Sequence, residues 1–504
     1  MTLADQIPVL VVALPLLAAP VCAALRSGDE HAAARIQDHL AWAITAAVSW
    51  IAFAIAIGLY VQVADGTVLS YAVGGWEPPW GIEIRIDTLN ALVALVVTFI
   101  GAVTATFARR SIVSEIPARQ RSLFYAAWML CFTGLLGITV TGDAFNLFVF
   151  LEISSLSSYV MIAMGRDRRA VTASFQYLIM GTIGATFLLI GVGFLYMMTG
   201  TLNMADLSGR LPALADTRTV QAAFAFLTVG IALKLAVFPL HLWLPNAYTY
   251  APSAVSAFIA ATSTKVALYT LMRFSFTVFS AEFAFQAMSF QYVLLPLSVA
   301  GILVASIVAI FQTDAKRLLA YSSVAQIGYM TLGISLATTT GVAAAILHLF
   351  NHALMKGALF LALGCVMYRV GSVQFDRMAG LGRAMPWTMA AIVIGGLSLI
   401  GVPLTAGFIS KWYLVLGAVE QGYWPIVALI VFASLLAAVY VWRMIEAAYL
   451  RPAPADRPRI EEAPAALLIP TWILALANLY FGIETSLPVG AALQASSQLM
   501  GVTP

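Results

Sequence analysis

Charged residues are scarce in this chain of 504 residues. Aspartate, glutamate, lysine and arginine make up only 10% of it, whereas 62% is hydrophobic. Because a soluble globular protein is about one-quarter charged, this composition excludes a soluble enzyme, a disordered protein and a nucleic-acid-binding protein. The formal net charge of +3 is too small to indicate an acidic partner. The composition is that of a membrane protein.

Cysteine is also rare. The three cysteines, Cys22, Cys131 and Cys365, lie far apart, each within an apolar run. They form no CxxC pair, zinc-ligand spacing or iron–sulfur motif, and the sequence has no P-loop. We therefore expect no redox centre, nucleotide site, metal or other cofactor in this chain. Membership of a larger enzyme complex stays open.

Long apolar runs dominate the sequence. A membrane-spanning helix needs about 20 mostly apolar residues, and this criterion predicts about fourteen spans. They are 7–25, 40–63, 88–108, 123–140, 144–164, 170–198, 220–244, 252–278, 289–311, 318–337, 340–369, 385–419, 424–449 and 464–484. The first span lacks the basic segment that precedes a signal peptide core, so it is predicted to be a retained helix.

The arginines predict the orientation of the spans. With the N-terminus outside, the outer loops hold only Arg85, Arg210 and Arg218. The inner loops hold Arg26, Arg35, Arg109, Arg110, Arg119, Arg121, Arg166, Arg168, Arg169, Lys316, Arg317, Arg369, Arg377, Arg383, Arg451, Arg457 and Arg459. Since positive loops stay inside, both termini are predicted on the outer side of the cell inner (plasma) membrane.

Two loops have a recognisable pattern. The outer loop 64–87 alternates at 82–86, which predicts a short hairpin with Trp76 and Trp80 at the membrane interface. The inner segment 451–463 is rich in proline and charge, which predicts a surface loop.

The lysines lie where the arginines do not. Four of the five are inside predicted spans: Lys234, Lys265, Lys356 and Lys411. A charge at mid-membrane costs about 2.5–3.5 kcal/mol on insertion scales, so such residues usually serve a function. The alternative is a lysine near a helix end that reaches to the interface. Lys234 and Lys265 fit this alternative poorly because each is near the middle of its span.

The remaining intramembrane charges have different interpretations. Arg273 and Arg443 lie toward helix ends and are expected to reach the interface. Glu446 lies three residues after Arg443, a spacing that predicts an ion pair. Glu152 is the one acid central to a span, and it is a candidate proton carrier or a structural partner for a lysine. Asp143, at the outer mouth of the same helix, is expected to cap it or to attract ions.

Histidines add titratable groups to one helix. His348, His352 and Lys356 are spaced i, i+4 and i+8, which places them on one helix face, about 6 Å apart along the axis. This row suggests a proton path. Packing is the alternative for a membrane histidine; metal binding is disfavoured because no cysteine or carboxylate joins the pair. His241 also falls in a predicted span.

Two predicted helices carry breaks beside a lysine. Pro239 follows Lys234, and Pro403 and Gly407 precede Lys411. Proline removes a helical hydrogen bond, and paired breaks at membrane depth are typical of ion sites in transporters. The two breaks suggest two related halves of the chain.

Four stretches together have a distinctive spacing. They are Thr141–Glu152 (TGDAFNLFVFLE), Lys234–Pro245 (KLAVFPLHLWLP), Ala251–Lys265, and Leu347–Phe360 (LHLFNHALMKGALF). In these stretches the chain resembles the proton-translocating antiporter subunits shared by Mrp-type multi-subunit cation/proton antiporters and the membrane arm of respiratory complex I. The resemblance runs over almost the whole chain.

This resemblance implies an all-α polytopic membrane protein of about fourteen transmembrane helices. Two inverted five-helix repeats, helices 4–8 and 9–13, are implied, with helices 7 and 12 discontinuous. The implied segments are 1–122 (three helices and the outer hairpin), 123–278 (first repeat), 289–449 (second repeat) and 464–504 (C-terminal helix and tail).

The resemblance also implies roles for the central residues. Glu152 would pair with Lys234, and Lys265 would pass a proton through His348 and His352 toward Lys411. Lys356, His241 and Asp143 are secondary candidates of less defined role.

The type of complex remains open between two alternatives. Thr141–Asn146 and the chain length resemble the D-type subunit of Mrp antiporters, whereas Gly401–Trp412 resembles complex I and hydrogenase-linked subunits. We expect a proton-translocating subunit of a Na⁺/H⁺ antiporter, with a redox-driven proton pump as the alternative. Other integral membrane subunits, protons, Na⁺ and lipid are the expected partners. A structural scaffold would be expected to lose the central charges, and a single-chain solute carrier to show a substrate pocket.

Overall fold

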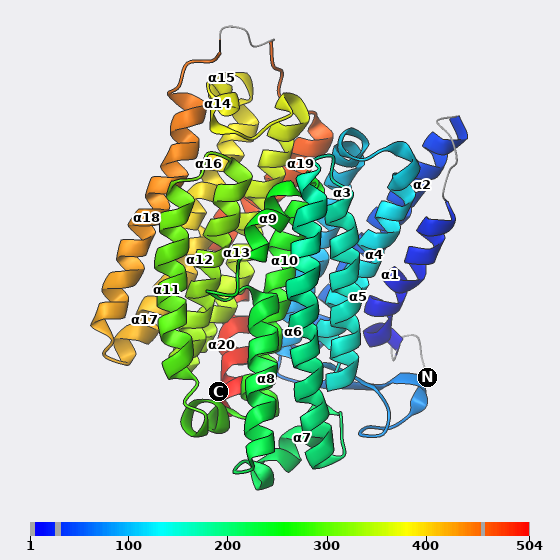
Figure 1. The fold of residues 1–504 in the computed structure, drawn as a ribbon, viewed down its shortest axis with the longest axis vertical. Helices are drawn as coiled ribbons and strands as arrows, with labels where there is room; N and C mark the ends of the chain where they lie inside the picture. The colour runs from blue at the N-terminus through cyan, green and yellow to red at the C-terminus, as the bar shows by residue number, and fades with distance from the viewer. Residues whose placement is uncertain (1–5, 26–31, 455–458, 503–504) are drawn as a thin grey trace.

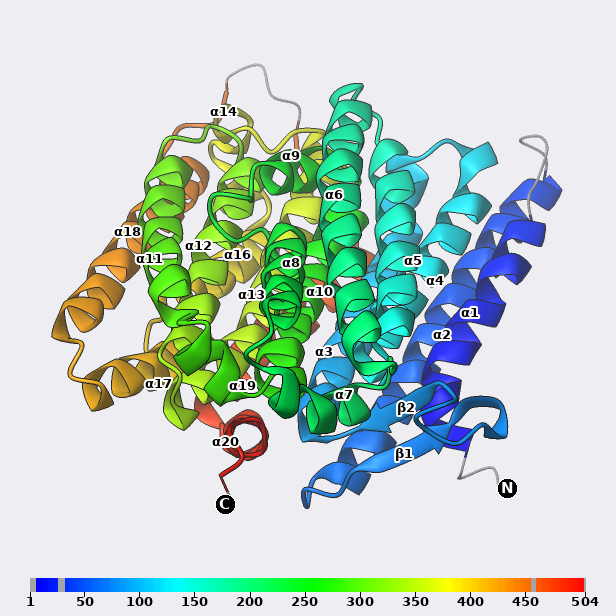
Figure 2. The same cartoon turned by 60° about the horizontal axis from the view of Figure 1, so that its bottom comes forward.

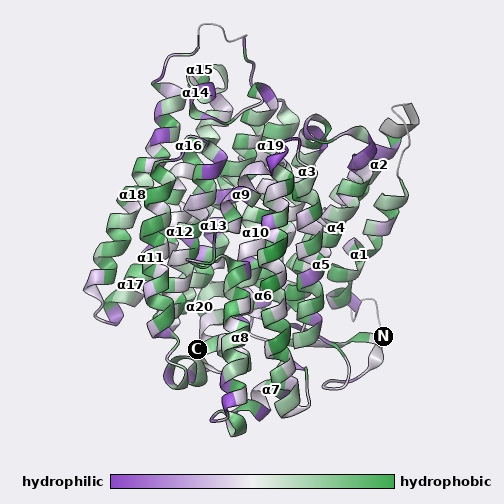
Figure 3. Ribbon diagram, viewed as in Figure 1, coloured by the Kyte–Doolittle hydropathy of each residue, from purple (hydrophilic) through white to green (hydrophobic). Residues whose placement is uncertain are grey.

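The computed structural model describes residues 6–25, 32–454 and 459–502, in which helices dominate (Figure 1). Hydrophobic residues cover most of the helices, and many hydrophilic ones lie at their ends (Figure 3). Within these residues, twelve helices are long and apolar enough to cross a membrane. They are α1 (Ile7–Ala24), α2 (Ala32–Val63), α3 (Thr88–Glu115), α4 (Ala118–Val140), α5 (Ala144–Ala163), α6 (Arg169–Thr199), α8 (Arg218–Leu235), α10 (Ser253–Met272, continued by the π-helix Arg273–Val278), α11 (Gln291–Ile310), α13 (Thr339–Val370), α18 (Trp424–Tyr449) and α19 (Ala465–Ile483).

Two further predicted spans contain helices that are more polar or shorter. The helix α12 (Ala315–Ser335) has 21 residues, and almost all of its side chains are buried. Because protein rather than lipid surrounds it, α12 tolerates polar residues. The helices α16 (Pro386–Ile400) and α17 (Ala406–Glu420) have 15 residues each. The count of fourteen depends on these two segments and stays a prediction.

Both predicted helix breaks are present. The helix α8 ends at Leu235, and α9 (Trp243–Tyr250) begins only beyond Pro239. The helix α16 is capped by Gly401, whose φ of 90° is accessible to glycine, and α17 begins beyond Pro403. Each break leaves main-chain groups free to contact side chains inside the bundle.

The helix α13 occupies the centre of the bundle. It is buried without interruption from Gly341 to Val366 and packs against α3, α10, α12, α16, α17 and α19. The pair α1 and α2 forms one edge of the molecule and α18 the opposite edge (Figures 1 and 2). The groups on α13 are therefore far from the outer edges of the helix bundle.

The predicted hairpin in the loop 64–87 is confirmed. Strands β1 (Leu69–Ala72) and β2 (Glu83–Ile86) are antiparallel, and Leu69 pairs with Ile86. Trp76 and Trp80, in the connecting segment, are 72% and 90% exposed, which suits aromatic anchors at an interface. Figure 2 shows the hairpin at the same end of the bundle as α7 (Met204–Arg210) and α20 (Ser486–Met500).

The basic loops gather at the opposite end. In Figure 1 the short helices α14 (Phe375–Met378) and α15 (Leu381–Ala384), with their arginines, lie at the end remote from α7 and α20. The start of α1 and the end of α20 share the hairpin end, as expected for termini on one side. Arg26, Arg457 and parts of the predicted segments 1–122, 451–463 and 464–504 lie outside the described residues.

The predicted ion pair between Arg443 and Glu446 is wrong. Glu446 instead accepts two hydrogen bonds from Arg451, from Nε at 3.1 Å and from Nη2 at 3.0 Å. Arg451 follows the end of α18, so its planar guanidinium can fold back and bind both carboxylate oxygens. Arg443 places its guanidinium over the ring of Phe375, 5.2 Å from the ring centre.

The prediction that Arg273 reaches the interface is also wrong. Its side chain is 9% exposed and binds Asp87, with Nη1 2.8 Å from Oδ2 and Nη2 2.9 Å from Oδ1. Asp87 also caps α3 by accepting a hydrogen bond from the Asn90 amide. Burial acts to raise the pKa of Asp87, but the Arg273 guanidinium outweighs burial and holds this pKa below its usual range. The ion pair therefore joins the C-terminal end of α10 to the start of α3.

Replacing Arg273 by methionine should destabilise the protein, because it leaves the Asp87 carboxylate buried without its cation. Removing one partner of a buried pair typically costs about 3–5 kcal/mol. A lower melting temperature of the purified protein in detergent, followed by tryptophan fluorescence, would show this loss. The double variant with Asp87→Asn should recover part of the loss, since asparagine also caps helices. Strictly additive losses in the double variant would show that the pair contributes nothing.

Candidate functional site

Glu152 and Lys234 form an ion pair between α5 and α8. Lys234 Nζ lies 3.7 Å from Glu152 Oε1, and the two side chains are 6% and 26% exposed, respectively. Glu152 lies near the middle of α5, whereas Lys234 lies in the last turn of α8, directly before the break. The pairing implied by the family resemblance is thus present in the structure.

Two hydroxyl groups of α5 complete the surroundings of this lysine. Lys234 Nζ lies 2.7 Å from Ser155 Oγ and 3.5 Å from Tyr159 OH, and it donates to both. These residues follow Glu152 by three and seven positions, so all three share one helix face. Gly181 on α6 leaves room for the Tyr159 hydroxyl, because a Cβ at Gly181 would overlap it. Neither hydroxyl was among the predicted site residues, although its spacing from Glu152 was a usable signal.

A small cavity lies beside Lys234 and is lined by both α5 and α10. Its volume is about 30 Å³, enough for a water molecule. Its polar lining consists of Ser154, Ser155, Ser158, Tyr177, Lys234, Ser263 and Thr270. The cavity thus provides a polar link from Lys234 toward α10, the helix that carries Lys265.

Lys265 is completely buried in the middle of α10. Its amine donates to the main-chain oxygen of Ala260 and lies 3.4 Å from Thr264 Oγ1. Within the described part of the chain, it is in no ion pair with a carboxylate. A buried amine that carries a charge here has only neutral oxygen atoms to stabilise it.

The row of titratable groups on α13 is present as predicted. The rings of His348 and His352 are nearly parallel, with centres 6.0 Å apart. His348 lies 2.8 Å from both Ser410 Oγ and Gln326 Oε1, one through each ring nitrogen. His352 is fully buried, and neither of its ring nitrogens has a hydrogen-bond partner among the described residues.

Lys356 continues this row by one further turn. Its amine donates to the main-chain oxygen of Leu319, at 2.8 Å, and to Ser322 Oγ, both on α12. Lys356 is fully buried. The row on α13 therefore contacts α17 and α12 at its His348 end, and α12 again at its Lys356 end.

Lys411 lies at the second helix break. Its amine donates to the carbonyls of Leu399 and Ile400, at 3.2 and 2.7 Å, and to Ser434 Oγ at 3.1 Å. The two carbonyls belong to the last turn of α16, where the helix dipole favours a cation. The ring of Tyr329 faces the amine, with its centre 4.9 Å away. Ser410, the neighbour of Lys411 in the sequence, contacts His348.

The two remaining predicted residues lie apart from this row. His241 is buried in the turn between α8 and α9, where its ring stacks on Phe238 with centres 5.3 Å apart. Asp143 caps α5 by accepting a hydrogen bond from the Asn146 amide at 2.6 Å, as expected for a cap. Burial raises the pKa of Asp143, although that hydrogen bond opposes the rise. About 13 Å of helix separates Asp143 from Glu152 at 1.5 Å per residue.

The central lysines differ in how their charge is balanced. Within the described residues, only Lys234 is ion-paired, whereas Lys265, Lys356 and Lys411 donate to carbonyls and hydroxyls. A proton added to one such group raises the electrostatic cost of a charge on its neighbour. This arrangement is suited to passing protons in steps.

Comparison with known proteins shows a family match over the part of the chain that contains the site. The family described as NADH:quinone oxidoreductase/Mrp antiporter, TM matches residues 141–437, which is more than half of the chain and contains every predicted site residue.

Individual relatives cover nearly the whole chain. NADH-quinone oxidoreductase subunit N of Desulforudis audaxviator is 45% identical over 440 residues, covering 85% of this chain and 87% of that protein. The D-type Na(+)/H(+) antiporter subunit of Alkalihalophilus pseudofirmus is 29% identical over 449 residues, covering 89% and 90%. A chain in the structure of the Mrp complex from Dietzia sp. DQ12-45-1b has a TM-score of 0.88 and 27% identity, covering 99% of this chain and 98% of that one. The chain therefore belongs to the NADH:quinone oxidoreductase/Mrp antiporter family.

Proposed function

We propose that this chain is the proton-translocating subunit of a multi-subunit Na⁺/H⁺ antiporter. The observation that carries the proposal is the ion pair of Glu152 and Lys234 at one end of a row of buried basic groups. We call this pair and the row of Lys265, His348, His352 and Lys411 the proton file. In the proposed order, protons pass from this pair to Lys265, then His348 and His352, and finally Lys411. Lys356, His241 and Asp143 are secondary members.

The geometry supports stepwise transfer along this file. The serine-lined cavity bridges α5 and α10, and the hydrogen bonds of Ser410 and Gln326 fix the orientation of His348. Lys411 lies on the negative end of α16, which stabilises its protonated form without a carboxylate. When a second proton enters the file, electrostatic repulsion between the two positive charges would drive the first proton onward.

The antiporter assignment draws on the relatives. The D-type antiporter subunit and the chain of the Mrp complex align with this protein over nearly their whole length. We infer that the chain functions with other integral membrane subunits, that Na⁺ is the coupling cation, and that both termini face outward from the plasma membrane.

A proton-pumping subunit of a redox-driven complex is the second candidate. The 45% identity to an NADH-quinone oxidoreductase subunit N favours it. Both candidates use the same proton file and differ in what drives it.

Purification of the native complex in mild detergent would separate the two candidates. For the antiporter, we expect only membrane subunits to co-purify, and addition of Na⁺ should dissipate a pH gradient in reconstituted vesicles. The opposite result would be co-purified flavin and iron–sulfur proteins, together with proton transport that depends on quinone and not on Na⁺. This result would overturn the antiporter assignment and support the second candidate.

A further inference from the structure

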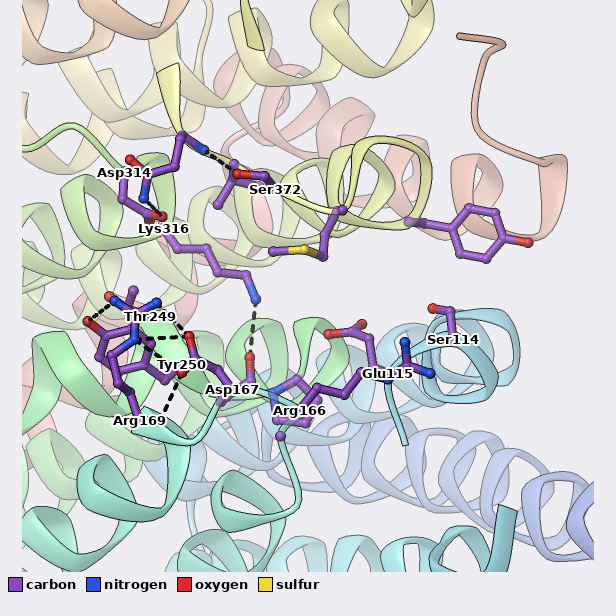
Figure 4. A pocket seen from close by; sticks show the side chains of 18 residues that line it. Ser114, Glu115, Arg166, Asp167, Arg169, Thr249, Tyr250, Asp314, Lys316 and Ser372 are labelled. Carbon is purple, nitrogen blue, oxygen red and sulfur yellow. Dashed lines mark hydrogen bonds and ion pairs between the residues drawn. The ribbon is translucent and has the colours of Figure 1, made fainter. Parts of the chain in front are cut away.

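A cavity of about 510 Å³ lies at the end of the bundle that carries the basic loops, and Figure 4 shows it from close by. Residues from the end of α3, the start of α12, the end of α13 and the segment after α9 line it. The segments 123–278 and 289–449 both contribute to its wall. None of the predicted site residues lines this cavity.

A buried lysine forms part of the cavity wall. Lys316 is 2% exposed, and its amine donates to the main-chain oxygen of Ala251 at 3.1 Å. Figure 4 shows this amine and the Glu115 carboxylate directed into the space between α12 and α3. The two charges interact electrostatically, yet no ion pair within 4 Å joins them in the described structure. Lys316 therefore faces the cavity with donors to spare.

The Glu115 carboxylate is fixed in place. Its oxygens accept hydrogen bonds from the Ser253 amide at 2.9 Å and from Ser111 Oγ at 2.6 Å. Arg166, Arg169, Asp167 and Asp314 are the other charged residues of the wall. Positively and negatively charged side chains surround the cavity, so it is better suited to hold water than an apolar ligand.

A row of polar atoms leads inward from Lys316 along α12. Leu319 and Ser322 follow it by three and six residues, so Ser322 lies about 9 Å further along the helix axis. Both of them accept hydrogen bonds from Lys356, the last group of the row on α13. His352, one turn away on α13, has two unpartnered ring nitrogens among the described residues.

A second contact connects Lys316 to α10. The Ala251 carbonyl that accepts from Lys316 also accepts from Ser256 Oγ at 3.2 Å. Ser256 lies one turn before Ala260, whose carbonyl accepts from Lys265. Lys316 thus lies near the segments of α12 and α10 that supply the hydrogen-bond acceptors of Lys356 and Lys265.

We propose that this cavity is a water-filled entrance to the proton file and that Lys316 carries protons between its water and Lys356. The Lys316 amine takes a proton from water and releases it through water to the Ser322 hydroxyl. The Ser322 hydroxyl, which donates to the Leu319 carbonyl in this structure, turns to the neutral Lys356 amine, gives it that proton and keeps the arriving one. This inference rests on the proposed function and gives Lys356 a defined place, as the link from the entrance to His352.

Three substitutions of Lys316 test the proposal in the reconstituted complex. Arginine keeps the positive charge but does not release its proton in proteins. We expect Lys316→Arg and Lys316→Met to reduce proton transport by about 100-fold, the low end for a positioned proton-transfer group. Lys316→His should retain part of the rate, because histidine can titrate.

Matched controls separate this inference from the proposed function. Arg119→Gln, which removes an exposed charge at the start of α4 outside the cavity, should stay within about twofold of the parent rate. Parent-like transport by Lys316→Arg, with none by Glu152→Gln, would overturn the entrance and leave the proposed function intact. Parent-like transport by Glu152→Gln would overturn the proposed function itself.

Thiol labelling gives a readout that does not depend on the fit of a larger side chain. Ser372 lines the cavity, whereas the three native cysteines are buried. We expect a membrane-impermeant cationic thiol reagent to modify Ser372→Cys and to slow transport by about 10-fold or more. Ala453→Cys, exposed at the same end but outside the cavity, should be modified without slowing transport. Unchanged transport after complete labelling of Ser372→Cys would contradict the proposal.

Discussion

Replacing Glu152 by glutamine is expected to reduce proton transport by at least about 100-fold. Glutamine preserves the shape of the side chain but carries no exchangeable acid proton, and it leaves Lys234 without its carboxylate. Lys234 is buried but Glu152 is 26% exposed, so removing the carboxylate should cost about 3 kcal/mol, the low end for a buried ion pair. At about 1.4 kcal/mol per tenfold, this cost corresponds to roughly 10²-fold in the stability of the charged intermediate. The loss should appear as a slower collapse of a pH gradient in vesicles that contain the assembled complex.

A matched control is available on the second broken helix. Glu420 is exposed at the end of α17, where it accepts a hydrogen bond from Thr340 at 3.0 Å. We expect Glu420→Gln to transport protons like the parent, because an exposed contact of this kind contributes little. Equal rates for Glu152→Gln, Glu420→Gln and the parent would show that Glu152 serves only in packing. Both variants should assemble with the same subunits, so yield and composition of the complex are measured alongside transport.

The helices and their breaks were predictable because they depend on local chemistry. Apolar length alone locates spans such as α3 and α6, and the breaks at Pro239 and Pro403 follow from the missing amide of proline. The row His348, His352 and Lys356 followed from helical spacing. These features need no knowledge of which helices are neighbours.

Contacts between distant segments were not predictable in this way. Arg273 binds Asp87, 186 residues away, and Ser410 contacts His348, 62 residues away. Whether a residue near a helix end reaches the interface or a buried carboxylate depends on the packing of the helices. Gln326 on α12 was missed for the same reason, since a helix covered by protein on all sides carries no apolar stripe that marks its inner face.

Lys265→Met is expected to reduce proton transport to the background rate without lowering the stability of the protein. Lys265 is fully buried and donates only to a carbonyl and a hydroxyl, with no ion pair among the described residues. Replacement by a methionine of similar length removes a group that is costly to bury. The melting temperature in detergent should therefore equal or exceed that of the parent, in contrast to Arg273→Met. Leu268→Met, a buried change on the same helix, should keep transport close to the parent rate. Because a structural lysine would lose stability together with transport, a lower melting temperature for Lys265→Met would assign this residue to packing rather than to the proton file.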